Sequence, residues 1–165
     1  MAAKSERSAQ LSVLDRLIDA DPKRTTEAPP TAAQSLKGLK AGLRRDIEWL
    51  LNTRQTPQEP PPDSAELQRS LHVYGLPDIC SMSLHSNRDY RRLVRAMETA
   101  LSTFEPRLRG IRVTLAPAAD PTARVLRFQI EGMLRVEPVP EHVTFDTVLE
   151  LTSGEYEVKG ERSAG

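Results

Sequence analysis

The sequence predicts an α+β fold in which N-terminal helices pack on a mostly antiparallel sheet of about four strands. Apolar residues recur at helical spacing up to Phe104 and at a period of two after it. The period-two segments have short connections, which favours an antiparallel meander. A chain of 165 residues is long enough for one ordinary domain. We expect a tail with a short helix over residues 1–30, a single domain over 31–160 and a disordered tail over 161–165.

Three apolar stripes predict three main helices. The first, from Leu11 to Ile18, is too short to be stable alone and must dock on something. The second predicts a helix from about Ala32 to Thr53, and the third a helix from Asn87 to Phe104.

Two structural interpretations are open for the glycines of the second helix, and two for its tryptophan. Gly38 and Gly42, four residues apart, either permit the close approach of another backbone or are weak points tolerated near the helix start, and the second reading is favoured. Trp49 lies at the edge of the apolar stripe. It either anchors a partner surface or fills the space between helix and sheet, and the core role is favoured.

A proline-containing connection separates the second and third helices. The segment Gln55–Asp63 holds four prolines and predicts a stiff, extended linker. Ser64 is suited to cap a short helix after it. Gly75, followed by Leu76 and Pro77, marks a turn that needs a positive φ.

Four period-two segments predict the strands. They lie around Ile111–Leu115, Leu126–Ile130, Val143–Leu149 and Tyr156–Val158. If the meander keeps chain order, the last hairpin lies at or near an edge of the sheet, where backbone donors and acceptors lack a neighbouring strand.

The junction between the helices and the sheet carries the sequence Glu105-Pro106-Arg107. Pro106 disfavours helical geometry at Glu105 and makes the segment extended. Residues two apart then project to the same side, so Glu105 and Arg107 form an acid–base pair. The pair is either a docking point or a local salt bridge that stiffens the junction, and the residues alone favour neither.

The charges cancel over the whole chain but are unevenly distributed. A formal net charge of zero argues against a globally basic nucleic-acid binder. Between Leu84 and Arg112 there are seven arginines against three acids, and between Glu131 and Arg162 eight acids against three bases. Both stretches are either solvated faces or surfaces for different protein partners. One such possibility is a generic interaction module that binds an acidic partner through the helix expected from Asn87 to Phe104, which we call the Arg-rich helix.

No catalytic, cofactor or metal site emerges from the sequence. The three histidines have no metal-ligand spacing, the single Cys80 forms no internal disulfide, and no Gly-rich phosphate loop is present. A lysozyme-like peptidoglycan hydrolase is the alternative, but it requires two carboxylates at one sugar bond. The candidates are Asp46, Glu48, Glu66 and Glu105, and nothing in the sequence brings two of them together.

The N-terminal residues are polar and no stretch is long and apolar enough to span a bilayer. We therefore expect a cytoplasmic protein without direct membrane insertion.

Several segments together resemble TssE, the small baseplate subunit of the bacterial type VI secretion system, which is similar to the small wedge protein of contractile phage tails. The resemblance covers roughly residues 11–159, and its most specific part is Arg45–Arg54. The segments are Leu14–Asp19 with Asp21-Pro22, Leu43–Arg54, Ser70 with Tyr74–Asp78, and Phe104–Leu108.

The resemblance implies a non-enzymatic subunit that joins a baseplate wedge to a contractile sheath. Glu105, Pro106 and Arg107 would lock it to the TssF–TssG core, in a baseplate that also holds TssK. Strands of the sheath subunits TssB and TssC would add to its sheet, so that it templates sheath assembly. It would act at the cytoplasmic face of the inner membrane. The implied strand-addition edge comprises Val143, Phe145, Thr147, Leu149, Tyr156 and Val158.

Overall fold

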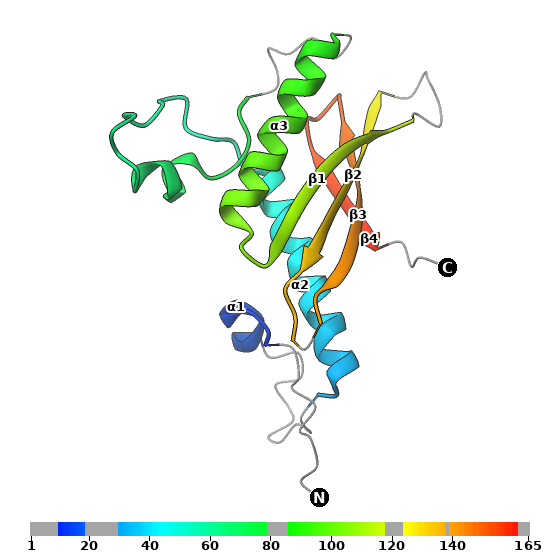
Figure 1. The fold of residues 1–165 in the computed structure, drawn as a ribbon. Coiled ribbons are helices and arrows are strands. Elements are labelled where there is room, and N and C mark those ends of the chain that lie inside the picture. The colour runs from blue at the N-terminus through cyan, green and yellow to red at the C-terminus, as the bar shows by residue number, and fades with distance from the viewer. Residues whose placement is uncertain (1–9, 19–29, 79–85, 118–123, 138, 162–165) are drawn as a thin grey trace, which may run out of the picture.

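The computed structural model describes residues 10–18, 30–78, 86–117, 124–137 and 139–161. Helices precede strands along the chain, as predicted (Figure 1). The helices are α1 (Val13–Leu17), α2 (Ala32–Asn52), the single-turn η1 (Leu67–Arg69) and η2 (Leu71–Val73), and α3 (Asn87–Phe104). The strands are β1 (Leu108–Ala116), β2 (Val125–Leu134), β3 (Glu141–Glu150) and β4 (Tyr156–Glu161).

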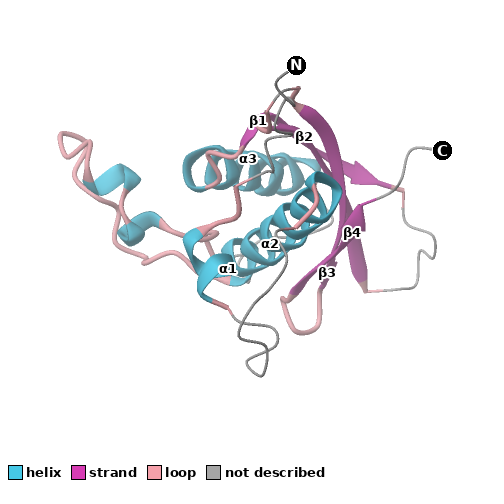
Figure 2. Ribbon diagram, turned by 90° about the horizontal axis from the view of Figure 1, so that it is seen from below, coloured by secondary structure: helices cyan, strands magenta, loops and turns pink. Residues whose placement is uncertain are grey.

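The four strands form one antiparallel sheet in the order β1-β2-β3-β4, which confirms the predicted meander and the α+β class. Figure 2 shows α2 and α3 side by side on one face of the curved sheet. The fold is therefore a layer of two helices on a layer of four strands, and β1 and β4 are its margins.

The core lies between these two layers. Leu43 and Ile47 of α2 and Met97 of α3 are fully buried against the inward side chains of the strands, among them Phe128 and Phe145. Complete burial of each such side chain contributes about 1.5–3 kcal/mol. The alternation of buried and more exposed residues along β2 and β3 fits a sheet covered on one face.

The start of α2 is fixed by a capping box. The Thr31 side chain accepts from the Gln34 N–H, and the Gln34 side chain accepts from the Thr31 N–H. This arrangement satisfies two N–H groups that have no partner within the helix. Its end agrees with the predicted one to within a residue.

The favoured role for Trp49 was wrong. Its side chain is 53% exposed, and the Arg45 guanidinium lies over its ring, 5.0 Å from the centroid. The neighbouring Ile47, Leu50 and Leu51 are all buried. Residue 49 therefore lies at the border of the apolar face and turns outward.

The two glycines of α2 make room for the segment that contains α1. A Cβ at Gly42 would lie 2.6 Å from an oxygen of Asp15, and one at Gly38 would lie 3.3 Å from Leu11. Both distances are tighter than nearly all real Cβ contacts. The predicted approach of another backbone was therefore wrong, because side chains of the α1 segment occupy the space beside both glycines.

Residues 54–76 of the connection between α2 and α3 leave the body of the fold and return to it. Arg54 and Leu76, at the two ends of this excursion, form a parallel bridge. Gly75 has φ +107°, as the predicted turn requires, and a Cβ there would meet the Thr53 carbonyl at 2.3 Å. Two single-turn helices replace the one expected after Ser64, and Ser70 caps the second by accepting from the His72 N–H.

Candidate partner-binding site

The Glu105-Pro106-Arg107 segment forms a turn rather than the extended segment that the sequence predicted, because the Leu108 N–H donates to the Glu105 carbonyl at 3.1 Å. Helix α3 stops at Phe104, and Glu105 has φ −115° and ψ 75°, outside the helical region, as a following proline favours. Arg107 Nε donates to Glu105 Oε2 at 3.1 Å, and Nη2 contacts the same oxygen. The predicted acid–base pair is therefore present.

This pair belongs to a larger chain of charges, which we call the charged corner: Asp15, Arg45, Asp46, Glu105 and Arg107. Arg107 Nη2 donates to Asp46 Oδ2 at 2.7 Å, and Arg45 Nη2 donates to Asp46 Oδ1 at 2.8 Å. Arg45 Nη1 donates to Asp15 Oδ1 at 2.7 Å. Consecutive charge-assisted bonds thus join the α1 segment, α2 and the turn between α3 and β1.

Burial shifts the ionisation of this corner. Burial raises the pKa of Glu105 above its usual value, although its hydrogen bond to Arg107 acts in the opposite direction. Burial opposes the charge of Arg107, but its bonds to Glu105 and Asp46 leave its pKa raised. Burial also disfavours ionised Asp15, yet its bonds to Ser12 and Arg45 lower its pKa.

The corner is only partly accessible to solvent. Glu105 is only 7% exposed, whereas Pro106 is exposed and the Arg107 side chain is 22% exposed. A partner can reach Pro106 and Arg107, while Glu105 acts by holding Arg107 in place.

Two of the hydrolase candidates are closer than expected. Asp46 and Glu105 both contact Arg107 Nη2, although they are distant in sequence. The guanidinium nitrogen between them satisfies both carboxylates instead of leaving one in an apolar pocket and the other facing a sugar bond. Among the residues described, no group of His, Cys, Asp or Glu is arranged to hold a metal ion.

A shallow hollow lies beside the accessible part of the corner. Arg107 Nη1 is buried and has no hydrogen-bond partner among the described residues. Because Nη1 is buried, an acceptor from another protein would reach it only after a rearrangement of the charged corner. The hollow is lined by Pro106, Arg107, Arg109, Arg135, Val136, Glu137 and Pro140.

The residues expected at the strand-addition edge divide between two strands. Four of them, from Val143 to Leu149, lie in β3. This strand pairs with β2 on one side and, over residues 145–149, with β4 on the other. Only Tyr156 and Val158 lie in the marginal strand β4. All six side chains are buried: Val143, Phe145, Thr147, Leu149, Tyr156 and Val158.

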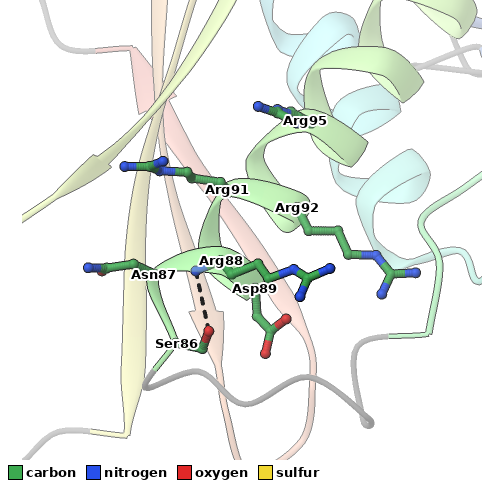
Figure 3. Close-up of a pocket in the computed structure, with 7 residues that line it drawn as sticks. All are labelled: Ser86, Asn87, Arg88, Asp89, Arg91, Arg92 and Arg95. Atoms are coloured by element: carbon green, nitrogen blue, oxygen red, sulfur yellow. Dashed lines mark hydrogen bonds between the residues drawn. The ribbon is translucent and has the colours of Figure 1, made fainter.

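The Arg-rich helix presents its arginines around its first turns (Figure 3). Ser86 caps the helix by accepting from the Arg88 N–H at 3.3 Å. Arg91 and Arg95 point to one side of α3, and Arg88 and Arg92 to the other.

Comparison with known families decides what kind of protein carries this corner. A family model described as baseplate wedge protein gp25 matches residues 37–139. The chain belongs to this family. The match contains Asp46, Glu105 and Arg107, and extends from α2 through β2. No curated protein and no solved structure matches the chain.

Membership confirms the resemblance drawn from the sequence, because TssE is the type VI homologue of gp25. It assigns the chain a structural role in a baseplate, assembled with other baseplate proteins. In the described part of the chain, no helix combines the length and the apolar character needed to cross a membrane.

Proposed function

We propose that the protein is a non-enzymatic wedge subunit of a type VI secretion baseplate that joins the TssF–TssG core to the contractile sheath. It works in the cytoplasm, in a baseplate that includes TssK at the inner face of the inner membrane. Its sheet accepts strands from TssB and TssC and so templates sheath assembly.

The observation that carries the wedge contact is the charged corner. Arg107 is fixed by Glu105 and Asp46, keeps 22% of its side chain exposed and borders an accessible hollow beside Pro106. A guanidinium held in this way presents a fixed positive charge to a partner and loses little side-chain freedom on binding. The hollow provides the space for a side chain of the TssF–TssG core.

The corner also suits a joint that carries force. It ties α1, α2 and the start of the sheet together, so a load applied at Pro106 is distributed over three segments. A surface salt bridge standing alone would contribute little.

Replacing Arg107 by Lys tests the wedge contact, because Lys keeps the charge but loses the planar fork of donors. We expect recovery of TssF and TssG with the variant to fall by about tenfold or more, which corresponds to about 1.4 kcal/mol. Arg112→Lys, at an exposed position of β1 outside the charged corner, is the matched control. Thermal unfolding of both variants separates loss of binding from loss of the fold.

Undiminished recovery of TssF and TssG with folded Arg107→Lys would contradict the proposed contact. Release of soluble fragments from peptidoglycan by the purified protein would support the hydrolase instead.

A further inference from the structure

The β4 margin of the sheet is occupied by side chains of the protein's own helix. The Glu150 N–H donates to the Glu155 carbonyl at 2.9 Å, so the alternation of an antiparallel pair turns the backbones of Tyr156 and Val158 away from β3. All four of these outward groups are bonded to side chains of α2.

Asn52 bonds Tyr156 from both sides of its amide. Its Nδ2 donates to the Tyr156 carbonyl at 2.8 Å, and its Oδ1 accepts from the Tyr156 N–H at 2.8 Å. Glu48 Oε2 accepts from the Val158 N–H at 3.1 Å, and Arg44 Nη1 donates to the Val158 carbonyl at 3.1 Å. These side chains take the place that a fifth strand would occupy.

The spacing of this row explains the match. Residues 44, 48 and 52 follow one another at intervals of four, so they lie along one face of α2. Figure 2 shows α2 running beside β4. Two successive outward residues of the strand, Tyr156 and Val158, therefore meet three successive side chains of the helix. A partner strand at this margin would have to displace all three.

The β1 margin is covered much less. Glu98 of α3 accepts from the Val113 N–H at 2.9 Å. The register of β1 on β2 is regular from Arg112 to Ala116, so Leu115 faces the same outward direction as Val113. Among the described residues neither the N–H nor the C=O of Leu115 has a hydrogen-bond partner, and its side chain is 45% exposed.

The helix beside this open margin is positively charged. Arg91 and Arg95 precede Glu98 by seven and three residues, which places them on the same face of α3. Because the chain reverses between α3 and β1, this part of the helix runs alongside the second half of β1. Figure 3 shows Arg91 and Arg95 on one side of α3, with Arg88 and Arg92 pointing away.

We propose that the second half of β1, from Val113 to Ala116, is the edge that accepts a partner strand, and that this strand carries acidic side chains. The backbone of Leu115 supplies the pairing, and Arg91 and Arg95 supply the charge complementarity. The inference rests on the proposed function, in which sheath subunits provide the strand, but it moves the docking edge from β4 to β1.

Amide hydrogen exchange in the free protein tests the two margins without any partner. We expect the Leu115 amide to exchange at least about 100-fold faster than those of Tyr156 and Val158, since only the latter are hydrogen-bonded. Equal protection of all three amides would overturn the assignment of the open edge. Protection of Leu115 that grows with protein concentration would identify a second copy of this chain as the occupant and overturn the sheath partner.

Capture of co-expressed TssB and TssC tests the partner. Arg91→Glu should reduce capture by about tenfold at low salt, and its matched control Arg88→Glu, on the other side of the same helix, should leave capture unchanged. Equal effects of the two variants would overturn the charge assignment. If the unaltered protein captures no sheath subunit while Leu115 exchanges fast, the proposed function fails although the open edge stands.

Discussion

The two margins of the sheet differ in how completely side chains of the adjacent helix bond the outward backbone groups of the edge strand. At β4, a row of three α2 side chains bonds every outward backbone group of Tyr156 and Val158. At β1, Glu98 bonds a single outward N–H and leaves Leu115 without a partner among the described residues. A margin can thus be closed by helix side chains as well as by another strand.

The difference teaches how one small sheet avoids indiscriminate pairing and still has a docking edge. An exposed edge invites any extended chain, and proteins block such edges in several ways. In the arrangement that we propose, the α2 side chains at β4 confine strand addition to the β1 margin, where arginines select among incoming strands by charge.

The largest contrast is expected from proline placed at each margin. Val158→Pro removes an N–H bonded to Glu48 and a fully buried side chain, so we expect a loss of about 3 kcal/mol or more. Leu115→Pro removes an outward N–H that no described residue bonds, and a loss of about 1 kcal/mol is expected. Urea unfolding measures both values, and equal losses would show that the margins are alike.

Alanine in place of the covering side chains gives a smaller contrast. Asn52→Ala removes two bonds to Tyr156 and should cost about 1–3 kcal/mol, while Glu98→Ala removes one bond to Val113 and should cost about half as much. Thermal or urea unfolding provides the comparison. A greater loss from Glu98→Ala would mean that β1 is the better-held margin.

The smallest expected effect is a change of stability with pH, caused by the charged corner at the start of β1. Burial raises the folded-state pKa of Glu105 above its ordinary 4.5, so the folded protein retains this proton to higher pH than the unfolded chain. Its contribution to stability therefore decreases as pH rises through the window just above 4.5. The pKa of Asp15 is lowered, so its contribution to stability is complete above its ordinary value of 3.8 and decreases as the pH falls below that value.

Glu105→Gln removes this titration. We expect unfolding free energies measured between about pH 4.5 and pH 7 to decline less steeply in the variant than in the unaltered protein. If the unfolding free energies of the two proteins decline with pH at the same slope, burial does not raise the pKa of Glu105.

Local patterns sufficed to predict much of the fold. The two periodicities identified α2, α3 and the four strands, and short connections predicted their antiparallel order. Proline chemistry predicted the end of α3 before Pro106, and the predicted pairing of Glu105 with Arg107 is present, although in a turn and not in an extended segment. The turn residues predicted the positive φ of Gly75. Each of these depends on residues that are neighbours in the chain, so the sequence by itself determined them.

Contacts between distant residues were decided only by the tertiary structure. Asp46 and Arg107 are 61 positions apart, and Asn52 and Tyr156 are 104 apart. No local pattern distinguishes an Asn on a helix that faces solvent from one that bonds a strand edge. For the same reason, the outward position of Trp49 depended on how the layers pack, because burial is set by which surfaces meet.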